Sequence, residues 1–147
     1  MMKISVLEGS EYFRGLLLLI ARDRAVAEPE AALMMRIGRT LGLEKEFCEG
    51  AVREILENSH VSSDPPVFSS PVLARMFIRD GLTIAAADRA VHEAEEEWLR
   101  LAAQRNGVGA DWYEAERDAA LAAMPRQGSR LELDDLVVEY LGAAGRG

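Results

Sequence analysis

The sequence predicts an all-α fold, a bundle of about seven helices made of two three-helix repeats and a C-terminal capping helix. The first observation is a stretch that occurs twice. Residues 23–30, Asp-Arg-Ala-Val-Ala-Glu-Pro-Glu, return 65 positions later (88 − 23) as residues 88–95, with six of the eight positions identical. The second observation is that apolar residues recur at helical spacing, and no segment shows the two-residue alternation of a half-buried strand. We infer a duplicated unit.

The same shift relates residues well outside the repeated stretch. It pairs Arg14 with Arg79 and Gly42 with Gly107. We therefore expect repeat one at about 10–57 and repeat two at about 71–124. The intervening linker, 58–70, contains two adjacent prolines that a helix does not tolerate. At 147 residues with 49% hydrophobic content, the chain suits a single domain, 1–147.

In repeat one, Ser10 is a candidate N-cap for a first helix over about 10–22. Leucines on both of its faces indicate a helix buried centrally in the bundle. Pro29 fits the first position of a second helix, which ends at Gly42, a C-cap residue. A third helix follows over about 44–58.

Repeat two restarts the pattern at Ser70-Pro71 with a fourth helix to about 87. We place Asp80-Gly81 inside that helix. A fifth helix over about 94–105 stops at Asn106-Gly107, and a sixth covers about 112–124. A last amphipathic helix, about 131–143, has no counterpart in either repeat and is predicted to cap the repeat interface.

Charge and composition exclude several classes of protein. Seventeen basic and twenty-five acidic residues give a net charge of −8, which repels phosphate backbones, so we expect no nucleic-acid partner. The most apolar run, residues 16–21, is far shorter than the roughly 20 residues that span a bilayer, so no membrane insertion is expected. A lone cysteine, Cys48, and the absence of a signal-peptide pattern favour a cytoplasmic location.

The two acidic turns are the candidate site. Hard cations such as Ca²⁺ and Mg²⁺ prefer oxygen ligands gathered on short loops, and each turn gathers several carboxylates. His92 lies four residues before Glu96, a spacing that would suit a softer ion. The candidate metal ligands are Asp23, Glu28, Glu30, Asp88, His92, Glu93 and Glu95.

A purely structural interpretation of the same turns stays open. Acidic residues at helix N-termini oppose the positive end of the helix dipole. Asp23 and Asp88 would then act as caps, and the arginine that follows each would pair with it. Val26 and Val91 would pin the turns to the core.

The motifs of common enzymes are missing from the sequence. It contains no Gly-rich phosphate loop, no nucleophile elbow and no zinc-protease helix. We therefore assign no catalytic and no cofactor-binding residues, and we expect a non-enzymatic protein. A divalent cation is the one cofactor under consideration.

Residues 19–26, Leu-Ile-Ala-Arg-Asp-Arg-Ala-Val, followed by Glu30 and a helix ending Leu-Gly-Leu at 41–43, resemble the TerB-like (tellurite-resistance) family. Residues 86–91, Glu95 and 106–108 resemble the same pattern. The resemblance implies an all-helical bundle of two related halves whose acidic turns face a common surface and bind a divalent cation. The implied ligands are Asp23, Glu28, Glu30, Asp88, Glu93 and Glu95.

The chain departs from the family where the family has glycine after the aspartate, because Arg24 and Arg89 stand there. It also lacks the His-Pro-Asp motif of the co-chaperone J-domains that accompany the family. We expect a TerB-like binding module, related to stress or tellurite resistance, whose acidic turns bind a divalent cation or a protein partner. The alternative is a metal-free protein-interaction or scaffold domain whose turns only cap helices.

Overall fold

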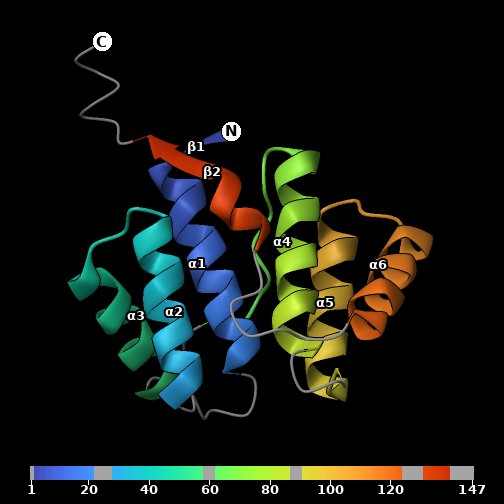
Figure 1. Ribbon diagram of the computed structural model, residues 1–147, viewed down its shortest axis with the longest axis horizontal. Coiled ribbons are helices and arrows are strands. Elements are labelled where there is room, and N and C mark those ends of the chain that lie inside the picture. The colour runs from blue at the N-terminus through green and yellow to red at the C-terminus, as the bar shows by residue number, and fades with distance from the viewer. Residues whose placement is uncertain (1, 22–27, 58–61, 87–90, 124–130, 140–147) are drawn as a thin grey trace. The chain divides into compact units, whose positions relative to one another are not determined.

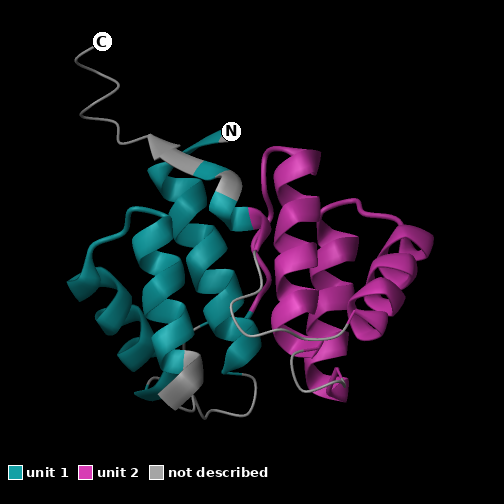
Figure 2. Ribbon diagram, in the orientation of Figure 1, with its two compact units in different colours: residues 1–63, 133–147 teal, residues 64–132 magenta. Residues whose placement is uncertain are grey.

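The computed structural model describes residues 2–21, 28–57, 62–86, 91–123 and 131–139. This part of the chain is mostly helical, with six α-helices and one pair of short strands (Figure 1). It divides into two compact units, residues 1–63 with 133–147, and residues 64–132 (Figure 2). The chain therefore passes into unit 2 after Ser63 and returns to unit 1 after Glu132. The prediction of an all-α class is confirmed.

Unit 1 contains the strand β1 (Met2–Ser5), the helices α1 (Val6–Ile20), α2 (Glu28–Thr40) and α3 (Lys45–Glu57), and the strand β2 (Leu136–Glu139). The strands pair in parallel, with Met2 opposite Leu136 and Ser5 opposite Glu139. Helix α1 contacts α2, α3 and both strands. Its residues Tyr12, Phe13 and Leu16 are fully buried, so the predicted central position of the first helix is confirmed within this unit.

Unit 2 contains α4 (Pro71–Ala85), α5 (Glu93–Arg105) and α6 (Ala110–Ala122). Phe77 of α4 anchors its core, with ring centroids 5.2 Å from Phe68 and 6.0 Å from Trp98. The extended segment before α4 is held by Asn106, whose side chain donates to Pro66 O at 2.9 Å and accepts from the Phe68 N–H at 2.8 Å.

The 65-residue shift recurs in the bounds of all six helices. Each of α4, α5 and α6 begins and ends 65 positions after α1, α2 and α3 respectively. The N-caps match as well, because the Ser5 hydroxyl accepts from Glu8 N–H at 3.1 Å and the Ser70 hydroxyl from Leu73 N–H at 3.2 Å. The helix bounds thus repeat with the same 65-residue spacing as the sequence.

The first helix begins earlier than predicted. Ser5, not Ser10, is its N-cap, and Ser10 lies inside the helix with its hydroxyl donating to Val6 O at 2.9 Å. A serine inside a helix can donate its hydroxyl proton to the backbone carbonyl four residues earlier, so a serine does not by itself mark the start of a helix.

The predicted C-terminal helix at 131–143 is wrong. Residues 132–135 form a single 3-10 turn, η2 (Glu132–Asp135), and the next four residues are the strand β2. Apolar residues in so short a run fit a strand as well as a helix, and the β-branched pair Val137-Val138 favours the strand. A pairing partner at β1 decides the outcome.

Among the described residues, no helix is both long enough and apolar enough to span a membrane.

Candidate functional site

The structure describes the predicted acidic turns unequally. Asp23 and Asp88 lie outside the described residues. Glu28 and Glu30 belong to the first turn of α2, but their side chains are also outside the description. His92, Glu93 and Glu95 are described at the start of α5, where His92 and Glu93 are exposed and Glu95 is half-buried. Val91, one of the two expected plugs, is half-buried as well.

The described part of the second turn caps a helix. His92 is the N-cap residue of α5, with φ −66° and ψ 149°. Its N–H donates to Glu95 Oε1 at 3.3 Å, and its carbonyl accepts from Glu96 N–H at 2.9 Å. This is the Glu half of a capping box, which satisfies a backbone donor that the helix leaves free. The N-cap residue of α5 is therefore His92, and the expected capping role of Asp88 lies outside the described residues.

Glu96, which the sequence paired with His92 as a possible ligand, binds arginines instead. Its carboxylate lies 3.3 Å from Arg117 Nη1 and 3.5 Å from Arg100 Nη2. Within the described residues, no group of three or more His, Cys, Asp or Glu side chains is placed to hold a metal ion. Because Asp23, Asp88 and the side chains of Glu28 and Glu30 are outside that set, the metal site stays a prediction.

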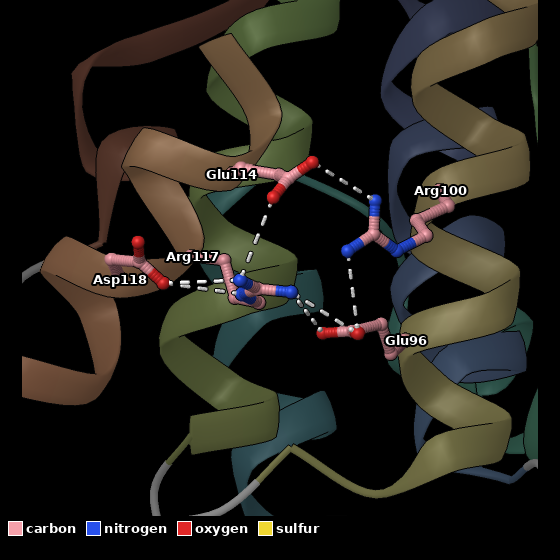
Figure 3. A network of polar contacts seen from close by, with 5 residues as sticks. All are labelled: Glu96, Arg100, Glu114, Arg117 and Asp118. Carbon is pink, nitrogen blue, oxygen red and sulfur yellow. Dashed lines mark hydrogen bonds and ion pairs between the residues drawn. The ribbon is translucent and has the colours of Figure 1, made fainter. Parts of the chain in front are cut away.

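A charged seam joins α5 to α6. Figure 3 shows Glu96 and Arg100 of α5 facing Glu114, Arg117 and Asp118 of α6. Arg117 contacts all three carboxylates, at 3.2 Å to Asp118, 3.3 Å to Glu96 and 3.9 Å to Glu114. Its hydrogen bond to Asp118 and the charge of Glu96 raise the pKa of Arg117. The seam thus places two cations among three anions, so every acid contacts at least one arginine while the group keeps one net negative charge.

Tyr113 lies beside this seam. Its side chain is 1% exposed, the Arg100 guanidinium stacks 4.9 Å from its ring centroid, and its hydroxyl has no hydrogen-bond partner among the described residues. Burial, with a further contribution from the charge of Glu96, raises the pKa of Tyr113 to about 12. A buried hydroxyl without a partner destabilises the fold, so the ring and not the hydroxyl accounts for the packing here.

A second cluster surrounds Arg79 of α4. Its guanidinium binds Glu116 at 2.8 Å and Glu132 at 3.3 Å, and stacks 5.2 Å from the Trp112 ring centroid. The hydrogen bond to Glu116 raises the pKa of Arg79. Arg79, Glu116 and Glu132 border an open groove of about 280 Å³ that Asp80 also lines. Three carboxylates and one guanidinium favour a cationic or neutral ligand over an anionic one.

Sequence reasoning missed Asp80. Its position inside α4 is confirmed, yet its side chain is 1% exposed and its Oδ1 accepts from Glu132 N–H at 2.6 Å. A carboxylate in a helix interior is expected on the solvated face, so its burial requires a hydrogen-bonding partner. The sequence signal that could have predicted its burial is its position among the apolar residues Phe77, Ile78 and Leu82.

No family model, no curated protein and no solved structure matches the chain. The TerB-like resemblance therefore stays an expectation based on the motif residues of the two repeats.

Proposed function

We propose that this protein is a non-enzymatic, TerB-like binding module of two three-helix repeats that recruits a protein partner, with its acidic turns serving to cap helices. The observation that carries the proposal is the bond from His92 N–H to Glu95 Oε1. It gives Glu95, a candidate metal ligand of the second turn, a hydrogen bond to the backbone at the start of its own helix, which supports the capping role. Glu96, its neighbour, is likewise engaged by Arg100 and Arg117.

Exposed apolar side chains at equivalent positions support a protein partner. Leu7 is the second residue of α1 and is 71% exposed, and Val72 is the second residue of α4 and is 54% exposed. These two positions are 65 apart, so each repeat presents a large aliphatic residue at the same point of its first helix. Single exposed aliphatic residues are common on protein surfaces, so the support lies in their recurrence at the same position of both repeats.

A second candidate function is binding of a divalent cation. It is favoured by the recurrence of three acids at the same offset, as Asp23 with Asp88, Glu28 with Glu93, and Glu30 with Glu95. The TerB-like resemblance implies the same residues. A cation bound in each turn would then neutralise three carboxylates.

Thermal melts separate the two functions. A ligand that binds only the native state raises Tm, and at 100 times its Kd it adds about 2.7 kcal/mol, or roughly 5–10 °C for a chain of this length. We expect Ca²⁺, Mg²⁺, Mn²⁺ and Zn²⁺ to leave Tm of the parent unchanged. A rise that disappears in the Asp23→Asn, Asp88→Asn double variant would establish the cation site and overturn our proposal. Asparagine caps and turns nearly as well as aspartate, so this variant should fold.

The partner surface is tested with the Leu7→Ser, Val72→Ser double variant. Because both side chains are exposed, we expect its Tm to stay close to that of the parent. The immobilised parent should retain a protein from cell extract that the variant does not retain. Equal retention by both baits would show that these positions do not form the binding surface.

A further inference from the structure

Unit 2 contains a second hollow, a pocket of about 260 Å³ between α5 and α6, which shares no lining residue with the groove beside Arg79. An apolar protein cavity of about 150 Å³ is large enough to bind benzene, so this pocket has room for a ligand of roughly ten non-hydrogen atoms. It is lined by Arg100, Ala103, Gln104, Val108, Ala110 and Tyr113.

The equivalent positions of repeat one show that pairing of the two helices does not require a cation here. Arg100 corresponds to Met35, 65 positions earlier, and Tyr113 corresponds to Cys48. In unit 1, Cys48 packs directly against Gly38, the counterpart of Ala103, because a Cβ at Gly38 would overlap Cys48 Sγ. Repeat two therefore has an arginine and a tyrosine where repeat one has a thioether and a thiol.

Arg100 is held in place at the wall of this pocket. Its guanidinium stacks 4.9 Å from the ring centroid of Tyr113, which is buried and therefore a fixed support. It lies 3.5 Å from Glu96 and 3.9 Å from Glu114, and Figure 3 shows it between these two acids. These contacts use at most two of the five N–H donors of the guanidinium, and the Arg100 side chain is 40% exposed. Donors are thus left for a ligand.

The rest of the lining determines which ligand suits those donors. Ala103, Val108 and Ala110 are apolar, and the Val108 N–H donates to Ala103 O at 2.8 Å, which fixes the turn above the pocket. No carboxylate is among the lining residues, and Arg100 is the charged one. A guanidinium binds a carboxylate through two parallel hydrogen bonds. The lining therefore favours an anionic head on an apolar body.

The net charge of the chain, −8, opposes any anion at long range. At physiological ionic strength this repulsion is screened beyond about 8 Å, so the groups in contact with the ligand have the larger effect. The two acids nearest to Arg100, Glu96 and Glu114, are also shared with Arg117, at 3.3 Å and 3.9 Å.

We propose that the pocket between α5 and α6 binds a small monocarboxylate with an apolar body, such as an aromatic acid. Arg100 holds the carboxylate, and Ala103, Val108 and Ala110 contact the body. This activity goes beyond the recruitment of a protein partner, because neither Leu7 nor Val72 takes part in it.

Titration of the full chain with benzoate at constant ionic strength, followed by NMR of the backbone amides, tests the site. We expect saturable shifts at the amides of residues 100–113, with a Kd of about 1 mM for a ligand of this size. Benzamide has the same shape without the charge, and acetate has the charge without the ring. Each should bind about ten-fold more weakly or worse.

Two variants locate the site, and a third is their matched control. Arg100→Gln removes the guanidinium, and Ala110→Phe narrows the pocket from an exposed position while keeping Arg100. Both should weaken benzoate binding about ten-fold or more. Arg105→Gln changes an arginine of the same helix that is 41% exposed and lies outside the lining, so it should change the Kd by less than about two-fold.

Any of three results would overturn the proposal. Benzoate shifts that do not saturate, or that lie outside residues 100–113, would show that the pocket is not the site. Equal binding of benzamide would show that the ligand class is not a carboxylate. An equal loss in Arg100→Gln and Arg105→Gln would reduce the effect to general charge. None of these results bears on the partner surface at Leu7 and Val72, which is tested separately.

Discussion

Gly42 and Gly107, 65 positions apart, both adopt positive φ, 75° and 70°, at the ends of α2 and α5. Each is followed by a residue whose N–H returns to the helix, Leu43 to Gly38 O at 2.9 Å and Val108 to Ala103 O at 2.8 Å. This is the Schellman arrangement, in which a left-handed glycine satisfies the last carbonyls of a helix. The two repeats thus end their second helices with the same backbone geometry.

Replacing Gly107 with alanine should destabilise the protein by about 1–2 kcal/mol, because a Cβ is strained at positive φ. No neighbouring atom lies within 4 Å of the position that the Cβ would take, so backbone conformation alone sets the cost. Gly50→Ala is the matched control, since Gly50 is mid-helix in α3 and also has no neighbour within 4 Å. It should stabilise by about 0.5–1 kcal/mol. Urea unfolding measures both changes, and equal signs would contradict the argument.

Gly38→Ala should destabilise unit 1 by overpacking. A Cβ at Gly38 would overlap Cys48 Sγ and lie 3.3 Å from Phe13 Cε1. Overpacking of this kind costs about 1–3 kcal/mol. In the Gly38→Ala, Cys48→Ala double variant the overlap is relieved, so the summed cost of the single changes should exceed that of the pair. Strict additivity of the unfolding free energies would show that Cys48 is not the obstacle.

Alkaline pH should destabilise the protein through Tyr113. Its pKa rises from 10.0 to about 12 on folding, so the folded state keeps the proton that the unfolded state loses. The stability is fully present below pH 10 and is lost as pH rises through about 12, by roughly 3 kcal/mol at about 1.4 kcal/mol per pKa unit.

Tyr113→Phe is the control for this effect. It removes a buried hydroxyl that has no hydrogen-bond partner among the described residues, so at neutral pH we expect stability equal to or higher than that of the parent. The slope of unfolding free energy between pH 10 and 12 should be smaller in the variant. Identical slopes in parent and variant would assign the alkaline effect to other groups.

The charged seam should depend on Arg117. Arg117→Gln leaves Glu96, Glu114 and Asp118 with Arg100 as the nearest cation in the seam (Figure 3). We expect a loss of about 1 kcal/mol at low salt that shrinks as added NaCl screens the remaining acids. Melts across a salt series measure it. A loss that does not change with salt would indicate lost packing of the arginine stem instead of charge.

Local sequence signals were sufficient for most of the helices. Proline at the start of α4, the glycines after α2 and α5, and apolar periodicity placed helix ends within about two residues, except at the start of α1. These signals succeed because caps and left-handed glycines act on backbone groups only a few residues away. The error at α1 has the same origin, since two serines, Ser5 and Ser10, both satisfy the local rule for an N-cap.

In the acidic turns, the residue pattern cannot distinguish a helix cap from a metal ligand. A glutamate three residues after an N-cap serves equally as a cap and as a metal ligand in sequence. In the structure, the Glu95 carboxylate accepts the His92 N–H at 3.3 Å, which supports the capping role, while its role as a metal ligand stays a prediction. The Glu96 carboxylate pairs with Arg100 of its own helix and with Arg117 of α6, which is 21 residues away in sequence.

By itself, the sequence determined the 65-residue repeat, the helical class and most of the helix ends, and the helix ends depend on short-range backbone chemistry. Only the tertiary structure determined the secondary structure of residues 131–139 and the burial of Asp80. The strand β2 forms because β1, at the opposite end of the chain, supplies its hydrogen-bonding partners. A run of four residues has no intrinsic preference strong enough to predict a strand from the sequence. Asp80 is buried because Glu132, 52 positions later, donates a backbone N–H to it. A contact between residues so far apart leaves no periodic trace in the amino-acid sequence.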